Sequence, residues 1–169
     1  MKKNRLTVEH LWRMARPAQP TLSPDGAQAC VSLTQYDMEE NKGTSSLWLL
    51  SAFGGEPRRL TTAGEKDAEP RWSPDGRWIA FLAKRPAPAK ADGKDKDPAD
   101  DEPQIHLIAP DGGEARRLTS MPTGAFGAKW FPDSRRIMFM SWVWPGTKLD
   151  KLGKRWQEKK DDKIGRAHV

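Results

Sequence analysis

Apolar and polar residues alternate along several short stretches of the chain, and this alternation predicts β-strands. Successive side chains of a strand point to opposite faces, so a half-buried strand shows an apolar residue at every second position. The stretches lie at 29–33, 47–51, 78–82, 105–109 and 137–140. None is long enough for a buried helix, so the pattern favours an all-β fold.

The predicted strands belong to an internal repeat. Residues 47–61 (LWLLSAFGGEPRRLT) align with 105–119 (IHLIAPDGGEARRLT) at a shift of 58, which superposes Gly-Gly-Glu and Arg-Arg-Leu-Thr in both copies. The same shift aligns 71–75 with 129–133, and Trp72 with Trp130. An earlier copy of this segment, 21–26, stands 50 residues before the second. The register holds over separate segments, which chance does not explain.

A tight turn stands at the centre of each repeat, with copies at Ser23, Ser73 and Phe131. In Ser-Pro-Asp-Gly, proline presets a φ near −65° and glycine supplies the positive φ that lets two strands close into a hairpin. The third copy has Ser134 where the others have glycine, and we expect a cost there because a Cβ disfavours positive φ.

One unit yields four short strands: into the turn, out of it, the Leu/Ile strand and the Arg-Arg-Leu-Thr strand. Four antiparallel strands that repeat every 50 to 58 residues match a β-propeller blade better than a solenoid coil. The fold class is therefore an incomplete β-propeller of about two to three four-stranded blades. Residues 86–103 consist of Pro, Ala, Asp, Lys, Gly, Glu and similar residues without an apolar period, which predicts a disordered loop between two strands of one blade.

The two ends differ from the blades. Residues 1–20 contain Val8, Leu11 and Trp12 at helical spacing after Thr7, which predicts a short helix with Thr7 as its N-cap. The propeller portion spans 21–146, and 147–169 is a charged segment in helical or loop form. The last six residues, 164–169, match the translation of a common sequencing adapter, ATC-GGA-AGA-GCA-CAC-GTC. We predict that they are a read-through artefact and that the gene fragment ends near Lys163.

The repeat resembles the propellers of prolyl oligopeptidase-family serine peptidases, and also those of Tol-type translocation proteins. Two flanking segments favour the acylaminoacyl-peptidase or dipeptidyl-peptidase-like branch. One is 6–12 (LTVEHLW), which runs directly into the first turn, and the other is 141–145 (SWVWP), which precedes the Lys-rich segment.

The resemblance implies a substrate-gating propeller that caps a C-terminal α/β-hydrolase domain and admits short peptides. In that family a Ser in Gly-x-Ser-x-Gly is followed along the chain by Asp and then His. This sequence has no Gly-x-Ser-x-Gly, so no catalytic residue is assigned and we expect the 169 residues alone not to be an enzyme. Between two and three blades cannot close a ring, so we expect further blades and then the hydrolase domain as the partner. The alternative is a non-enzymatic interaction propeller of the Tol type.

Few side chains suggest chemistry of their own. His10, His106 and His168 lack the short spacings of zinc sites, and we expect His106 to face solvent because it alternates with apolar neighbours. Glu39 and Glu40 are similar to the glutamate pair with which dipeptidyl peptidases hold a substrate N-terminus, but they lie in a predicted hairpin loop and are better interpreted as solvated.

The recurring aspartates and paired glycines are also assigned to turns. Asp25, Asp75 and Asp133 occupy one position of the repeat. The glycine pairs 54–55 and 112–113 are not followed by a helix start, so they do not form a phosphate cradle. We assign no metal and no cofactor.

Composition narrows the expected partners. The net charge of +6 comes from the ends, because 1–16 and 147–169 each sum to +4 and the middle to −2. Solvated termini explain this better than a nucleic-acid surface. Eight Trp argue against simple disorder. One cysteine, Cys30, excludes an internal disulfide, and no apolar stretch approaches the roughly 18 residues that span a bilayer. We therefore expect a cytoplasmic protein without nucleic-acid or membrane partners.

Overall fold

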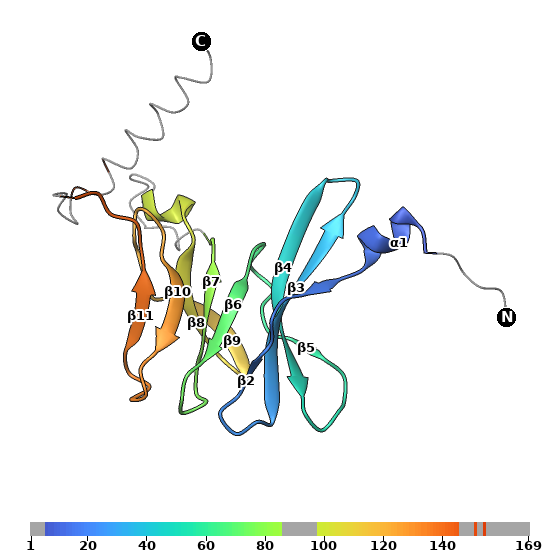
Figure 1. Ribbon diagram of the computed structural model, residues 1–169, viewed down its shortest axis with the longest axis horizontal. Helices are drawn as coiled ribbons and strands as arrows, with labels where there is room; N and C mark the ends of the chain where they lie inside the picture. Colours follow the sequence, from blue (N-terminus) through green and yellow to red (C-terminus); the bar gives the residue numbers. More distant parts are fainter. Residues whose placement is uncertain (1–5, 86–97, 146–150, 152–153, 155–169) are drawn as a thin grey trace, which may run out of the picture.

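The computed structural model describes residues 6–85, 98–145, 151 and 154 (Figure 1). The chain begins with one short helix, α1 (Val8–Arg13), at the predicted place. Thr7 is its N-cap, and the backbone N–H of Thr7 donates to Nδ1 of His10 at 3.2 Å. No residue of α1 is buried. The remaining elements are strands apart from one 3₁₀ turn, which confirms the all-β prediction.

The first antiparallel sheet, blade 1, follows α1. Its innermost strand is broken into β1 (Arg16–Pro17) and β2 (Thr21–Leu22), and both pair with β3 (Gln28–Asp37). The outer strands are β4 (Lys42–Ser51) and β5 (Arg58–Arg59). The sheet is therefore a meander from inside to outside.

Blade 2 repeats this order with four continuous strands. They are β6 (Ala68–Trp72), β7 (Ile79–Ala83), β8 (Gln104–Ala109) and β9 (Gly112–Arg117), paired in sequence order. The described chain then supplies the two inner strands of blade 3, β10 (Phe126–Trp130) and β11 (Ile137–Met140). The blades stack side by side in chain order (Figure 1), because β6 lies between β2 and β10. This is an incomplete β-propeller with the predicted blade count.

The repeated turns have the predicted backbone. Gly26 and Gly76 both adopt φ +71°, and Ser134 adopts φ +55° in the third copy. The expected strain at Ser134 is accompanied by a compensating contact, since the backbone N–H of Asp75 donates to its hydroxyl at 3.0 Å. This hydrogen bond joins the turn of blade 2 to the turn of blade 3.

A tryptophan at the entry of each later turn ties its blade to the one before. The indole N–H of Trp72 donates to the carbonyl of Thr21 at 3.1 Å, and the indole N–H of Trp130 donates to that of Arg71 at 3.0 Å. Thr21 and Arg71 occupy equivalent places on the innermost strands β2 and β6. The same hydrogen bond therefore fixes both successive blade pairs.

Replacing Trp72 with phenylalanine removes this donor and leaves most of the ring. We expect a loss of about 1 kcal/mol in the free energy of unfolding, measured by urea denaturation, because one part-buried hydrogen bond between blades is lost. Trp48→Phe is the control, since the Trp48 indole donates to Ser46 within its own strand. Equal losses in both variants would contradict a role of Trp72 between blades.

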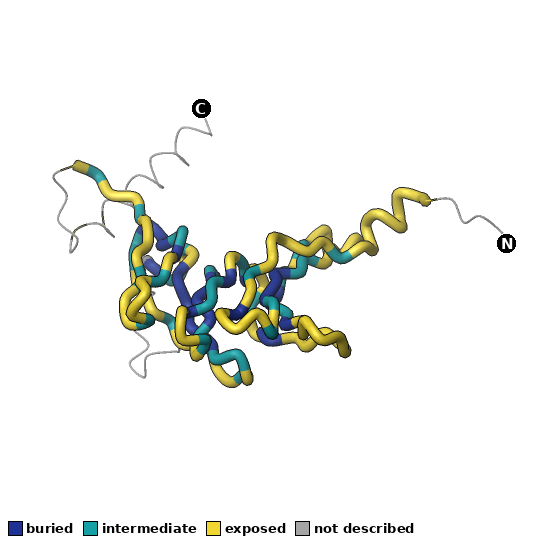
Figure 2. The backbone as a smooth tube through the Cα atoms, turned by 60° about the horizontal axis from the view of Figure 1, so that its bottom comes forward, coloured by how far each residue is buried: buried dark blue, intermediate teal, exposed yellow. Residues whose placement is uncertain are grey.

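The apolar side chains form two clusters, each shared by neighbouring sheets, and the buried part of the backbone lies in the middle of the molecule (Figure 2). The cluster that joins blades 1 and 2 consists of Cys30, Leu47, Leu49, Leu60, Ile79, Phe81, Ala83 and Ile108. A smaller cluster, Ala80, Ile105, Leu107, Ala125 and Ala128, joins blades 2 and 3. Because blade 2 lies between two blades, both of its faces are buried, and five of the six residues of β8 are buried.

Part of the predicted disordered loop is ordered. Residues 86–97 lie outside the described residues, but Pro98–Asp101 form a 3₁₀ helix, η1, in which Ala99 is fully buried. The prediction was wrong for 98–103 because composition does not reveal the tertiary contacts: Asp100 pairs with Arg117 at 2.5 Å, and the carbonyl of Pro103 accepts from Ala125 N–H at 2.9 Å. The charged segment 147–169 and its final six residues lie outside the described residues, apart from 151 and 154.

Candidate functional site

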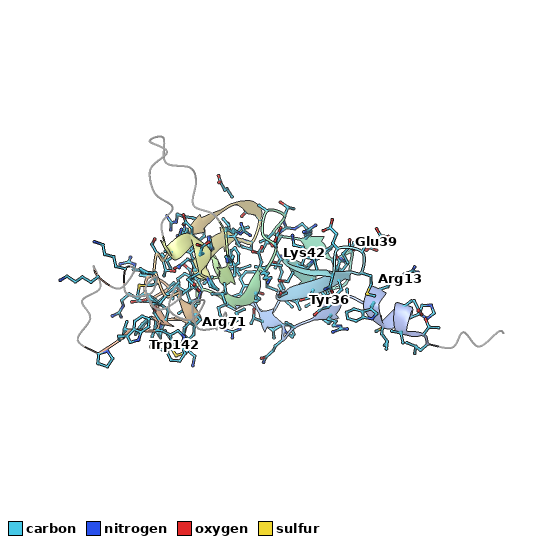
Figure 3. The ribbon with its side chains drawn as sticks, turned by 90° about the horizontal axis from the view of Figure 1, so that it is seen from above. Arg13, Tyr36, Glu39, Lys42, Arg71 and Trp142 are labelled. Carbon is cyan, nitrogen blue, oxygen red and sulfur yellow. The ribbon has the colours of Figure 1, made fainter. Side chains whose placement is uncertain are left out.

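The innermost strands form one wall of the molecule, and ionisable side chains lie on it. Figure 3 shows Arg71 on β6 at the same side as Trp142, which follows blade 3. Lys129 stands at the equivalent place on β10 and is exposed, whereas Arg71 is half-buried and donates to the carbonyl of Pro70 at 3.0 Å. Glu69, also exposed, precedes Arg71 on β6. The wall therefore presents fixed charges of both signs.

Glu69 sits in an irregular part of its strand. The pairing of β6 with β7 shifts register between Ala68 and Arg71, and Glu69 adopts φ +51°. The equivalent residue of blade 3 is Gly127, with φ +65°, and a Cβ there would stand 2.6 Å from Cε of Met140. The same bulge thus recurs in both blades, but only blade 2 carries a carboxylate at it. A bulge re-aims a side chain and is common next to functional sites.

A second group of charges is buried at the opposite edge from the Ser-Pro-Asp-Gly turns. Asp67 is fully buried and pairs with Arg85, whose Nη2 lies 2.5 Å from Oδ2. The ion pair of Arg117 and Asp100 lies in the same blade. The pair of Asp67 and Arg85 joins the start of β6 to the end of β7, and the pair of Arg117 and Asp100 joins the end of β9 to η1. The two residues of each pair are 17 or 18 positions apart in the sequence, and no sequence pattern indicates that they pair.

His106 lies within this group. It is 3% exposed, its ring is 5.7 Å from that of Phe81, and Nδ1 lies 3.1 Å from the carbonyl of Gln104. The prediction that His106 faces solvent was wrong. Alternation of apolar and polar residues implies a solvent-exposed face only when the sheet packs against a single neighbour, and blade 2 has a blade on either side. Burial lowers the pKa of His106, and Arg85 and Arg117 nearby lower it further.

This lowered pKa predicts acid-sensitive stability. The neutral ring is favoured in the folded state, so the unfolded chain binds the proton more tightly, with a pKa near the ordinary 6.5. Stability from His106 should be intact above pH 6.5, fall as the pH drops below it, and level off below the folded pKa. Urea unfolding between pH 7.5 and 5 measures this slope. His106→Gln should flatten it, and an unchanged slope would contradict the prediction.

The other residues singled out in the sequence have structural places. Asp25, Asp75 and Asp133 each accept from the backbone N–H two residues on, at 3.0, 3.1 and 3.0 Å, which confirms their turn role. Hydrogen bonds lower the pKa of each carboxyl: chiefly from the Ser23 and Ser73 hydroxyls for Asp25 and Asp75, and from the Arg135 N–H for Asp133. The glycine pairs at 54–55 and 112–113 all have positive φ, as turn glycines.

Glu39 and Glu40 lie in the hairpin between β3 and β4, as predicted. Their backbone N–H groups donate to Oδ1 of Asp37 at 2.9 and 3.1 Å, and both side chains are exposed. The hairpin also carries Lys42, which pairs with Glu65 at 2.7 Å (Figure 3). The two glutamates are thus part of an exposed turn of blade 1.

The cysteine and the other two histidines do not form a reactive site among the described residues. Cys30 is buried, and burial raises the pKa of its thiol to about 12, so it stays protonated at neutral pH. His10 caps α1, and His168 lies outside the described residues. In 6–85 and 98–145, no three His, Cys, Asp or Glu side chains come together as a metal site. No described helix is long and apolar enough to cross a membrane. The chemistry that the described residues offer is therefore the charged inner wall of Glu69, Arg71 and Lys129, which can orient a polar chain.

Two curated relatives of the chain are peptidases. It is 28% identical over 156 residues to the uncharacterized peptidase YuxL of Bacillus subtilis, which covers 92% of this chain and 22% of that protein. It is also 28% identical over 134 residues to dipeptidyl-peptidase 5 of Porphyromonas endodontalis, covering 79% of this chain and 17% of that protein. The chain thus spans about a fifth of the length of these relatives. No family model matches.

Solved structures confirm the propeller. The acylaminoacyl peptidase of Pyrococcus horikoshii superposes with a TM-score of 0.54 at 20% identity over 75% of this chain and 17% of that one. The β-propeller domain of the trilobed protease of Pyrococcus furiosus gives 0.52 at 20% over 75% and 34%. A TolB-like protein of Agrobacterium tumefaciens gives 0.55 at 21% over 80% and 41%. The chain therefore corresponds to part of a propeller of the kind found in acylaminoacyl-peptidase-like enzymes, and it has the TolB-like repeat.

Proposed function

We propose that this chain forms the first blades of a propeller that gates access to the catalytic domain of a serine peptidase acting on short peptides. The observation that carries the proposal is the similarity to a peptidase over 92% of the chain. The propeller fold alone would support many functions.

A rigid propeller selects substrates by size. The indole hydrogen bonds of Trp72 and Trp130 and the contact between Asp75 and Ser134 join successive blades. Blades fixed in this way would leave only the space inside the ring for a peptide. An extended peptide can follow the inner wall, whereas a folded protein is too wide.

The charges of the inner wall add orientation. A peptide carries a carboxylate at one end and an ammonium at the other, and Arg71 and Lys129 complement the carboxylate while Glu69 complements the ammonium. In the longer protein, the resemblance implies Ser attack on the peptide, an acyl-enzyme, and an oxyanion hole of backbone N–H groups. Those groups belong to the α/β-hydrolase domain and to none of the residues described above.

The second candidate is a non-enzymatic interaction propeller of the Tol type, which the TolB-like fold supports. It would bind partner proteins through its blade faces. The genomic sequence that continues this reading frame separates the two. Gly-x-Ser-x-Gly with later Asp and His supports the peptidase, and a stop codon after the last blade supports the interaction propeller.

The enzymatic test uses the complete protein encoded by that reading frame. We expect it to hydrolyse short fluorogenic peptides but not folded proteins, and to react with a fluorophosphonate probe. The 169-residue chain by itself is the control and should show neither activity. Complete protein without peptide hydrolysis would overturn the proposal. Trp72→Phe should admit longer peptides if blade rigidity sets the size limit. The cytoplasmic location and the absence of nucleic-acid and membrane partners stay predictions.

A further inference from the structure

The first two Ser-Pro-Asp-Gly turns enclose a groove. The turns that follow β2 and β6 lie at the same end of the molecule (Figure 1), and the space between them has a volume of about 320 Å³. Residues of both turns line it, together with the turn between β8 and β9. Four rings form its apolar walls, those of Trp72, Pro24, Pro74 and Pro110.

The groove is open at a place that a serine fills between the next two blades. There the backbone N–H of Asp75 donates to the hydroxyl of Ser134 at 3.0 Å. One blade earlier the equivalent residues are Asp25 and Gly76, and glycine has no side chain to accept from the N–H of Asp25. Within 6–85 and 98–145, no other residue accepts from this N–H. The groove therefore offers a donor and room for a hydroxyl group, which the second pair of turns obtains from the protein itself.

Hydrogen-bond acceptors lie in the same lining. Oδ1 of Asp25 and Oδ1 of Asp75 each accept from the serine hydroxyl of their own turn, at 2.5 and 2.6 Å. These bonds fix both carboxylates and leave Oδ2 of each available to a ligand. The side chain of Gln28, which is exposed, adds an amide that can donate and accept.

Nearby arginines offset the two carboxylates. Hydrogen bonds from the Ser73 hydroxyl and the Arg77 N–H, and then the charge of Arg77, lower the pKa of Asp75. Arg58 reaches across from blade 1 and donates to the carbonyl of Pro110 in the groove lining. Two carboxylates and two guanidinium groups are close to balance, so the groove favours a neutral polar ligand over a cation.

We propose that this groove binds one ring of a saccharide. A pyranose carries C–H groups on its faces and hydroxyls around its edge, so one face packs on Trp72 and the proline rings. One hydroxyl accepts from the N–H of Asp25, as the Ser134 hydroxyl does from Asp75, and others donate to the carboxylates. The volume lies at the lower end of the roughly 300–1,000 Å³ of small-molecule sites, which suits a single ring. The site is independent of the proposed peptidase function.

An NMR titration of the 169-residue chain with methyl α-glucoside, methyl α-galactoside and methyl α-mannoside tests the proposal. We expect at least one glycoside to shift the amide resonance of Asp25 and the indole resonance of Trp72 saturably. The amide of Asp75 is already bonded to Ser134 and should shift less. The absence of a saturable shift with all three glycosides would overturn the proposal.

Further probes identify the class of ligand. The tripeptide Gly-Ser-Gly offers a hydroxyl on a peptide, and Gly-Lys-Gly offers a cation. A response to either tripeptide without one to the glycosides would also contradict saccharide binding. The trisaccharide of the glycoside that binds separates the two sources of such a ring: tighter binding than the monosaccharide indicates a longer glycan, and equal binding indicates a free sugar.

Three variants locate the site. Gly76→Ser supplies the hydroxyl that Ser134 supplies one blade later, and it fits, because φ is +71° against +55° and a Cβ would lie 3.7 Å from Cδ of Pro24. It should abolish the shift at Asp25. Ser134→Gly is the matched control and should preserve glycoside binding. Gln28→Ala should weaken binding about fivefold through one lost hydrogen bond. Unchanged affinity in Gly76→Ser or in Gln28→Ala would overturn the proposal, and neither result depends on peptide hydrolysis.

Discussion

Asp67→Ala is expected to lower the free energy of unfolding by about 3–5 kcal/mol. The carboxylate is fully buried, and its partner Arg85 has a side chain only 14% exposed. Removal of one member of a buried pair leaves the other charge without compensation in a poorly solvated place. Urea unfolding of this chain at neutral pH measures the loss.

Glu65→Gln is the matched control for that loss. It breaks the pair with Lys42, which has similar geometry at 2.7 Å but side chains 43% and 64% exposed. Water replaces the lost partner there, so we expect no measurable change in stability. If the two variants were equally destabilised, burial would not explain the effect at Asp67.

The backbone around Asp67 makes relaxation difficult. Its N–H donates to the carbonyl of Ser45 at 3.1 Å, and its carbonyl accepts from the hydroxyl of Ser32 at 2.7 Å. Both partners belong to blade 1. Asp67 therefore joins two blades through its backbone while its side chain neutralises Arg85. Because these hydrogen bonds hold the backbone in place, the chain at position 67 cannot shift to let water reach Arg85 after the carboxylate is removed.

The fold was predictable because its signals are local and repeated. Pro, Asp and Gly specify a turn within four residues, and the structure has that turn at Gly26, Gly76 and Ser134. Trp72 and Trp130 marked the entry of each turn in the sequence, and they make the same hydrogen bond in the structure. The donors are 58 residues apart and their acceptors, Thr21 and Arg71, are 50 apart, which are the two spacings of the repeat in the sequence.

The buried charges were not predictable, because they break the repeat. The residues 58 positions after Asp67 and Arg85 are Ala125 and Val143, so the pair has no counterpart in blade 3. Alternation also failed at His106, because the strand that carries it has a blade on either side. Whether a strand has one or two buried faces depends on the stacking of sheets, which is information from outside the strand.

The inner wall was also predictable only in part. Turn and strand patterns place Arg71 and Lys129 at equivalent positions, and this could be seen in the alignment of 71–75 with 129–133. That these strands lie innermost follows only from the order in which the sheets pair and stack. The positive φ of Glu69 has no signal in the sequence, since glycine is the residue expected there.

Phe81→Ala is expected to cost about 3–5 kcal/mol, and its equivalent in the next blade provides the control. Phe81 is 0% exposed within the cluster that joins blades 1 and 2, so truncation leaves a cavity that the surrounding strands cannot fill. Phe139→Ala makes the same chemical change at the same place of the repeat, where the ring is 37% exposed, and should cost clearly less. Urea unfolding of both variants compares them. Equal costs would show that exposure does not govern the difference between the two interfaces.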